Sequence, residues 1–466
     1  MSIESINPAT DEVIETFEPF TEREVDEALG RARACFLNWR TTTFAERGAL
    51  MRRVSAYLRS HAGELGHMIT LEMGKPIAEA EAEIEKCAWA CDFYAENAEK
   101  FLADENTPSG ATQSYVAYRP LGVVLAVMPW NYPFWQVFRF AAPAVMAGNV
   151  GVLKHASNVS QSALAIERVF RECDAPDGLF QTLLVPGAQV ASIIADPRVA
   201  AVTITGSEPA GVSVATASGA ALKKSVLELG GSDAFIILED ADIPAAAQMA
   251  TRARFQNTGQ SCIAAKRFIV VEAVADAFEQ AFVAAAKALV VGDPLDRATQ
   301  VGPLARTDLR DALHEQVLAS VEQGAHVALG GEPLDRPGAY YAPTILTGVT
   351  PAMTAFREET FGPVAAVIRA RDTDEAVALA NDSDFGLGGA LWSRDLATAQ
   401  QLAARLESGA VFINGMTASD PRLPFGGVKH SGYGRELAAF GIREFVNIQT
   451  VWIGPATSAP TKVAAE

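Results

Sequence analysis

The sequence predicts an α/β protein in which doubly wound parallel sheets are covered by helices on both faces. The first observation is length: domains hold roughly 100–200 residues, so 466 residues predict two or three domains. The second is the alternation, from about residue 120, of short apolar runs with longer amphipathic ones, which is typical of strands and crossover helices. The third is composition, 49% hydrophobic and 20% charged, which excludes a disordered chain.

Helices are expected before residue 105. The apolar residues between 25 and 39 recur at spacings of three and four, and segments 45–70 and 76–104 repeat that pattern, which indicates amphipathic helices. The polar stretch 106–110 ends the pattern, and the β-rich run 115–118 begins a strand.

The next segment alternates between the two patterns. Strands are predicted at 123–127, 150–153, 182–185 and 201–204, with helices at 134–147, 160–173 and 187–195 between them. A second α/β set is predicted from strands at 234–238, 268–271, 365–369 and 411–414 and a helix at 274–289. Such sheets place a nucleotide site at the carboxyl ends of their strands.

Charge and cysteine content exclude several partners. The 38 Lys and Arg against 56 Asp and Glu give a net charge of −18, which attracts neither nucleic acid nor anionic lipid. The five cysteines are scattered, as in a reducing compartment. Cys87 and Cys91 lack a second Cys/His pair, so we expect helix packing and no metal site. With no signal peptide or membrane span in the sequence, we expect a cytoplasmic protein.

Three short segments carry residues that suit acyl chemistry. Cys262 lies in a loop of small residues just before a strand, where a thiol is reachable, although many free cysteines are buried packing residues. Glu228 is flanked by leucines and followed by paired glycines; an acid in an apolar setting can act as a base, and a satisfied carboxylate is the alternative. Asn131 follows the strand 123–127, where its amide could donate to an oxyanion or simply form a turn.

A glycine-containing turn follows the strand 201–204. Gly206 and Gly211 are spaced G-x-x-x-x-G, without the Lys-Ser/Thr of a phosphate loop. Ser207 and the first helical N–H groups are still able to contact a phosphate.

Taken in order, these segments resemble the aldehyde dehydrogenase superfamily over nearly the whole chain. Within it the sequence is most similar to bacterial succinate-semialdehyde dehydrogenases, through residues 153–156, 412–415 and 419–420. The motifs that carry the superfamily resemblance are Pro129-Trp130-Asn131, Val152-Leu153-Lys154, Thr205-Gly206-Ser207, Leu227-Glu228-Leu229-Gly230-Gly231, Gly259-Gln260-Ser261-Cys262, Glu359-Thr360-Phe361-Gly362-Pro363 and Pro424-Phe425-Gly426-Gly427.

The resemblance implies a role for each motif residue. Cys262 would attack the aldehyde as a nucleophile, Asn131 would stabilise the oxyanion together with the Cys262 N–H, and Glu228 would activate the water that opens the thioester. The resemblance also implies a nicotinamide coenzyme. Its contacts would come from Pro129, Trp130, Lys154, Ser157, Gly206, Ser207, Gly230, Glu359 and Phe361.

The coenzyme preference depends on the residue three positions after Lys154. Relatives that prefer NAD commonly have Glu there, which repels a 2′-phosphate, whereas this sequence has Ser157. We therefore expect NADP, with NAD left open as a second coenzyme.

A substrate carboxylate needs a cation or hydroxyl near the site. Arg139 lies among aromatic residues on the helix that starts at the site, and we expect it to meet the distal carboxylate, with an internal salt bridge as the alternative. Trp135 would form a wall, and Ser419 and Ser261 would assist.

The resemblance further divides the chain into parts. Residues 1–114 and 137–229 would form the coenzyme domain, 230–422 the catalytic domain, 115–136 and 423–454 an oligomerisation arm, and 455–466 a tail. Strands at 115–118 and 446–452 would pair between subunits of a dimer or a dimer of dimers.

Other functions stay open from the sequence. The substrate could be another aldehyde, such as glutarate semialdehyde. Glu228 argues against a CoA-acylating enzyme, in which a thiol takes the acyl group. A non-catalytic binding relative of the fold is the alternative from another class, and the joint presence of Cys262, Glu228 and Asn131 argues against it.

Overall fold

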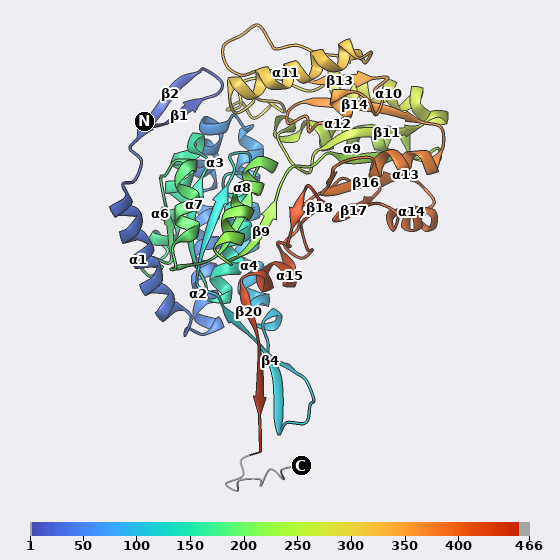
Figure 1. Ribbon diagram of the computed structural model, residues 1–466. Helices are drawn as coiled ribbons and strands as arrows, with labels where there is room; N and C mark the ends of the chain where they lie inside the picture. Colours follow the sequence, from blue (N-terminus) through green and yellow to red (C-terminus); the bar gives the residue numbers. More distant parts are fainter. Residues whose placement is uncertain (1, 456–466) are drawn as a thin grey trace.

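The computed structural model describes residues 2–455. The chain forms two α/β units and a narrow β arm that projects from the first unit (Figure 1). The predicted tail, apart from Pro455, lies outside the described residues. The predicted α/β class with parallel sheets is confirmed, since every strand of the two large sheets runs parallel to its neighbours except one end strand in each, β19 and β12.

The first unit is built on a sheet with the strand order β19-β9-β8-β5-β6-β7, in which β19 alone is antiparallel to its neighbour. The strands β5 and β6 are almost entirely buried, as expected for a parallel sheet with helices on both faces. Its strands are β5 (Val123–Met128), β6 (Val150–His155), β7 (Phe180–Thr182), β8 (Val199–Thr205), β9 (Lys224–Glu228) and β19 (Gly432–Tyr433).

Helices surround the first sheet. Thr21 and Thr43 form capping boxes with Glu24 and Glu46 at the starts of α1 and α2, which fixes where these helices begin. The single helix expected over 45–70 is two helices that meet at His61. The helices of this unit are α1 (Glu22–Trp39), α2 (Phe44–Ser60), α3 (Ala62–Met73), α4 (Ile77–Phe101), α5 (Trp135–Ala147), η1 (Ser157–Val159), α6 (Ser160–Glu172), η2 (Gly187–Gln189), α7 (Val190–Ala195), α8 (Glu208–Ala220) and α15 (Ala438–Glu444).

The second unit has a sheet with the order β12-β13-β14-β11-β10-β16-β17, in which β12 is antiparallel to β13. Separate apolar clusters pack on its two faces. Its strands are β10 (Asp233–Ile237), β11 (Ala265–Val271), β12 (His326–Leu329), β13 (Thr344–Thr347), β14 (Val364–Ala370), β16 (Gly388–Trp392) and β17 (Ala410–Ile413). Its helices are α9 (Ile243–Phe255), η3 (Gln256–Gly259), α10 (Glu272–Lys287), α11 (Thr307–Glu322), α12 (Thr354–Arg357), α13 (Thr373–Asn381) and α14 (Leu396–Ala403).

The β arm differs from the expectation in two ways. Its strands β4 (Gln113–Pro120) and β20 (Val446–Ile453) pair antiparallel with each other inside one chain, with the short β3 (Glu105–Asn106) on the other side of β4. Pairing between subunits stays a prediction, since the outer edge of β20 has no partner strand among residues 2–455. The predicted arm was also too long, because β5 lies in the middle of the first sheet.

The last part of the chain returns to the first unit. The hydroxyl of Tyr94 on α4 donates to the carbonyl of Ala438 at 3.1 Å, and Asn149 Nδ2 donates to the carbonyl of Phe445 at 2.9 Å. Leu437, Ile442 and other residues of this segment belong to the main apolar cluster of the first unit. The core of the first unit is thus completed by the C-terminal segment.

Two small sheets complete the topology, formed by β1 (Ile3–Asn7) with β2 (Glu12–Phe17), and by β15 (Phe385–Gly386) with β18 (Val428–Lys429). None of the helices within residues 2–455 is long and apolar enough to cross a membrane.

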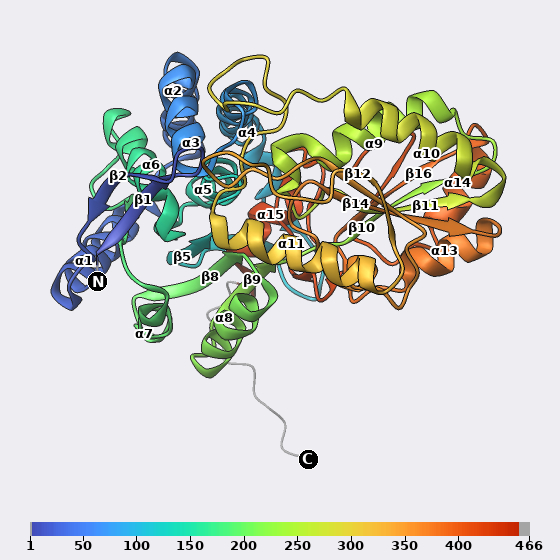
Figure 2. The same ribbon diagram turned by 90° about the horizontal axis from the view of Figure 1, so that it is seen from above.

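The two large sheets face each other end to end. The first sheet presents its carboxyl ends, after Met128, Thr205 and Glu228, toward the amino ends of the second, at Asp233 and Ala265. The view from above shows the two units side by side, with α11 extending from their junction over the second unit (Figure 2). The loops at this junction carry the residues that the sequence singled out.

Candidate active site

The loop that carries Cys262 is held in an unusual backbone conformation. Asn257, Thr258 and Gly259 all have left-handed φ angles, 53°, 55° and 73°, which non-glycine residues seldom adopt. Arg254, fully buried at the end of α9, donates to the carbonyls of Gly259 and Ala265 and so bridges the two ends of the loop. The loop conformation is therefore fixed from inside the second unit.

Lys266, which the sequence analysis missed, supports the same loop. Its buried ammonium donates to the carbonyls of Ser261 and Cys262, at 2.8 and 3.0 Å, and forms an ion pair with Glu359 at 3.2 Å. Glu359 also accepts from the N–H of Gly231 at 3.0 Å. Lys266 and Glu359 thus tie the cysteine loop to the glycine turn after β9. Nothing in the local sequence marks Lys266, because it reads as one residue of an apolar strand.

The Cys262 side chain lies at the border between protein and cleft and is partly exposed. Burial raises the pKa of its thiol to about 12, although the positive charges of Arg139 and Lys266 act in the opposite direction. The resting sulfur is therefore a protonated thiol at neutral pH, and its proton must leave when the sulfur attacks.

Asn131 comes from the loop after β5 and is anchored to the cysteine loop. Its Nδ2 donates to the carbonyl of Gln260 at 3.1 Å, while Asn257 Nδ2 donates to the carbonyls of Asn131 and Gln260 at 2.9 and 3.0 Å. Half-buried Glu79 on α4 accepts from the Asn257 N–H at 2.6 Å. This network fixes the amide beside the nucleophile, as an oxyanion donor requires.

Glu228 is the last residue of β9, and its carboxylate is buried and without hydrogen-bond donors on either oxygen. Burial, followed by the negative charge of Glu436, raises its pKa well above the usual range, while Arg139 and Arg435 oppose the shift. A carboxylate with a raised pKa is a stronger base than an ordinary one, which suits a group that takes a proton from water.

Arg139 is paired inside the protein. Its guanidinium forms an ion pair with Glu436, donates to Thr205 Oγ1 at 3.1 Å and lies 4.5 Å from the ring centre of Phe425. This is the internal salt bridge that the sequence left as the alternative. Because Glu436 already neutralises its charge, the contact between Arg139 and the substrate carboxylate stays a prediction, one that this ion pair disfavours.

Most of the predicted coenzyme and catalytic residues line one cavity of about 250 Å³, which we term the Cys262 cleft. The ring centres of Trp130 and Phe361 lie 5.7 Å apart, edge to face, across it. Gln136, Thr205, Leu229 and Leu309 were not predicted to line it. The full lining is Pro129, Trp130, Asn131, Gln136, Thr205, Gly206, Ser207, Leu229, Gly230, Cys262, Leu309, Glu359 and Phe361.

Lys154 and Ser157 line a different cavity, of about 620 Å³, at the carboxyl end of β6. Lys154 forms no ion pair with any described residue, and burial lowers its pKa. Arg306 and Asp308, also in the lining, pair with each other at 2.7 Å. The cavity therefore contains an ammonium without an ion-pair partner and the Ser157 hydroxyl, and the carboxylates of Glu4 and Asp11 also line it.

The remaining predicted substrate residues lie outside both cavities. Buried Trp135 begins α5, where its backbone N–H donates to Glu83 at 2.9 Å. Buried Ser419 accepts from Lys86 Nζ at 2.6 Å. Ser261 contributes its carbonyl to Lys266. Lys86 was missed because nothing in the sequence of α4 distinguishes it from a surface lysine.

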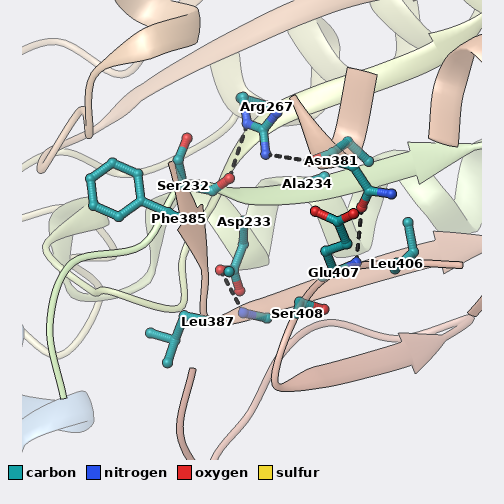
Figure 3. A pocket seen from close by; sticks show the side chains of 14 residues that line it. Ser232, Asp233, Ala234, Arg267, Asn381, Phe385, Leu387, Leu406, Glu407 and Ser408 are labelled. Atoms are coloured by element: carbon teal, nitrogen blue, oxygen red, sulfur yellow. Dashed lines mark hydrogen bonds between the residues drawn. The ribbon is translucent and has the colours of Figure 1, made fainter. Parts of the chain in front are cut away.

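A further small cavity lies at the amino ends of β10 and β16 (Figure 3). The Gly388 N–H donates to Asp233 at 3.0 Å, and Arg267 Nε donates to the Ser232 carbonyl at 3.0 Å. Its volume of about 20 Å³ is enough for one water. It is thus too small for a substrate.

Comparisons with known proteins agree with the motifs. The aldehyde dehydrogenase family matches residues 1–451. The chain is 53% identical to a Synechocystis sp. protein named probable succinate-semialdehyde dehydrogenase (NADP+), covering 97% of this chain and all of that one. It is 54% identical to a Mycolicibacterium paratuberculosis protein named succinate-semialdehyde dehydrogenase (NADP+), covering 98% of each.

Solved structures share the fold. The succinic semialdehyde dehydrogenase of Streptococcus pyogenes, in complex with NADP+, superposes with a TM-score of 0.95 at 39% identity, covering 97% of this chain and 100% of that one.

Proposed function

The chain belongs to the aldehyde dehydrogenase family, and from that premise we propose that it oxidises succinic semialdehyde to succinate with NADP. The observation that carries the chemistry is that Cys262, Asn131 and Glu359 line one cleft, with the unpartnered Glu228 carboxylate at the end of a neighbouring strand. The substrate and coenzyme follow from relatives of that name at 53–54% identity along nearly the whole chain.

The first step is attack by the Cys262 sulfur on the aldehyde carbon. Because the thiol is partly exposed to the cleft, its proton leaves to water as the sulfur adds. The Asn131 amide and the Cys262 N–H donate to the oxygen that becomes negative. Removing one such donor typically costs about 3–4 kcal/mol of barrier height.

A bound coenzyme would supply the hydride acceptor for this oxidation, and Trp130, Glu359 and Phe361 of the Cys262 cleft would hold it there. Glu228 then takes a proton from a water that attacks the thioester carbonyl, and the sulfur of Cys262 leaves as the product carboxylate forms. The raised pKa of Glu228 suits this role, since a base of ordinary carboxylate pKa would take a proton from water less readily.

The residues around Lys154 fit the 2′-phosphate of NADP. The Lys154 ammonium has no anionic partner among the described residues, and Ser157 adds a hydroxyl without a negative charge. A phosphate is a suitable partner for this ammonium. A carboxylate at position 157 would repel it.

We propose that the protein is a cytoplasmic homo-oligomer. All its cysteines are free thiols, which suits a reducing compartment. The edge strand β20 exposes Ile448, Trp452 and Ile453, and an exposed apolar strand edge is a pairing surface for another chain. Light scattering at enzymatically active concentrations would reveal a monomer if this were wrong.

The test is the formation of reduced coenzyme from succinic semialdehyde, with NADP+ and NAD+ compared at equal concentrations. We expect rapid formation with NADP+ and no activity in Cys262→Ala. Turnover of neutral aldehydes alone would overturn the substrate, and preference for NAD+ would overturn the coenzyme.

A further inference from the structure

Helix α4 contacts both the cysteine loop and the loop after β5 through two glutamates. Glu79 Oε2 accepts the N–H of Asn257 in the cysteine loop at 2.6 Å. Glu83 Oε1 accepts the N–H groups of Phe134 and Trp135, where the loop after β5 enters α5, both at 2.9 Å. Because Glu79 and Glu83 are four residues apart, they share one face of α4 and lie about 6 Å apart along its axis. One helix face thus holds both loops.

The loop after β5 is held by a buried ion pair. Glu83 uses its second oxygen to pair with Lys75, and both side chains are buried. The Lys75 ammonium lies 3.7 Å from the ring centre of Tyr132, the residue after Asn131. The Glu83 carboxylate also lies at the start of α5, where a negative charge is favourable. The segment after Asn131 is therefore held by groups whose charges compensate each other.

Glu79 is compensated differently. It is half-buried, and no Lys, Arg or His among residues 2–455 forms an ion pair with it. Burial raises its pKa, followed in that direction by the charge of Glu83, while the Asn257 N–H, Lys75 and Arg252 act in the opposite direction. A carboxylate that is removed from water requires hydrogen bonds in exchange. For Glu79 that hydrogen bond comes from the other unit of the molecule.

Asn257 connects Glu79 to the proposed oxyanion donor. Its Nδ2 donates to the carbonyls of Asn131 and Gln260, and the Gln260 carbonyl also accepts from Asn131 Nδ2 at 3.1 Å. A carboxamide nitrogen carries two N–H groups. Asn131 thus keeps its second N–H for the cleft that it lines. Asn257 fixes Asn131 directly at its backbone, and at its side chain through the shared carbonyl.

The backbone at Asn257 depends on its contact with Glu79. The left-handed φ angles of Asn257 and Thr258 cost about 1–3 kcal/mol each and persist only where the surroundings impose them. Thr258 is anchored separately, since its Oγ1 accepts the N–H of Gly302 at 3.0 Å. The N–H of Asn257 is bound by Glu79. Without that acceptor, Asn257 can relax to an ordinary φ and turn its amide away from Asn131.

We propose that Glu79 is a positioning residue for the reaction at Cys262, holding the Asn131 amide, through Asn257, where the oxyanion forms. The inference rests on the proposed function, since it takes Cys262 as the nucleophile and Asn131 as the oxyanion donor. Glu79 belongs to the first unit and Asn257 to the second, so the same bond aligns the two units at the site. A misplacement of about 1 Å costs about 100-fold in rate.

The test uses Glu79→Leu, which removes the acceptor, and two reactions of Cys262 that need no coenzyme. With p-nitrophenyl acetate, the sulfur adds to the carbonyl, an oxyanion forms, and p-nitrophenolate leaves. With iodoacetamide, the sulfur displaces iodide and no oxyanion forms. The other four cysteines are buried, and Cys262→Ala gives the background. We expect acylation to slow about 10- to 100-fold in the variant, and alkylation to change less than about twofold.

Three further proteins control the result. Glu79→Gln keeps one acceptor oxygen and should restore most of the acylation rate. Glu96→Leu is the matched control, because Glu96 is an exposed glutamate on the same helix, and it should leave both rates unchanged. In an Asn131→Ala protein, adding Glu79→Leu should slow acylation by less than about twofold more, because Glu79 acts through Asn131.

Asn257→Gly tests the next link of the same chain of contacts. Glycine adopts the left-handed φ readily and keeps the N–H that Glu79 accepts, but it lacks the amide that holds Asn131. It should slow acylation and leave alkylation unchanged. This variant provides the test if Glu79→Leu does not fold, as judged by circular dichroism.

The outcomes separate the two proposals. A wild type that neither oxidises succinic semialdehyde nor is acylated at Cys262 would overturn the proposed function and this inference with it. Normal wild-type reactions with an unchanged acylation rate in Glu79→Leu would overturn the role of Glu79 alone. An equal loss of acylation and alkylation would mean that Glu79 supports the fold in general, and it would also overturn the inference.

Discussion

The buried charged residues on the two sides of Cys262 differ in whether they have partners. On the loop side, Arg254 is bonded to backbone carbonyls and Lys266 is paired with Glu359. On the coenzyme side, Glu228 and Lys154 have no partner of opposite charge among the described residues. The difference separates charges that stabilise the fold from charges that are available to a proton or a phosphate.

The largest effect is expected for Glu228→Gln, which removes the proposed base. The steady-state rate should fall about 10²- to 10⁴-fold, because the amide cannot take a proton from water. Rapid-quench or stopped-flow measurement should still show one reduced coenzyme per site in the first turnover. A variant without that burst would place Glu228 before hydride transfer, and full activity would exclude it as the base.

Arg139→Met tests a buried charge that has a partner, Glu436. Breaking the buried pair leaves Glu436 uncompensated, so the free energy of unfolding should fall by about 3–5 kcal/mol. Denaturant unfolding measures this change. The ratio of KM values for succinic semialdehyde and butanal should stay at the wild-type value. A selective rise in the semialdehyde KM would return the carboxylate-binding role to Arg139.

Ser157→Glu places a carboxylate beside Lys154. The preference for NADP over NAD, as the ratio of kcat/KM values, should fall about 10- to 100-fold, because the new charge repels a phosphate and pairs with the ammonium. Ser157→Ala is the control, since it removes the hydroxyl without adding charge, and should shift the ratio much less. An unchanged ratio in Ser157→Glu would show that the phosphate lies elsewhere.

Sequence reasoning succeeded where the signal was local. The strand at 123–127 and the helices around 25–39 and 160–173 follow from apolar spacing, and their observed bounds differ by a few residues. Most residues of the Cys262 cleft were predicted from short motifs at the ends of strands. A parallel sheet brings such strand ends together at one edge.

Sequence reasoning failed where the residue that a side chain contacts is distant in the chain. Arg139 was assigned to a ligand because its partner, Glu436, belongs to the C-terminal segment. Lys86 and Lys266 were missed for the same reason, since their importance comes from contacts with Ser419 and Glu359. The pairing of β4 with β20 likewise joins segments that no spacing rule connects.

The return of the C-terminal segment to the first unit has a consequence for biosynthesis. The N-terminal half of the chain leaves the ribosome first, yet its core lacks Leu437, Ile442 and Phe445 until translation is nearly finished. Its sheet also waits for β19 to pair with β9. The first unit must therefore remain incompletely folded during most of translation, with apolar surface exposed to chaperones and to aggregation, and it reaches its native state only after the second unit has been made.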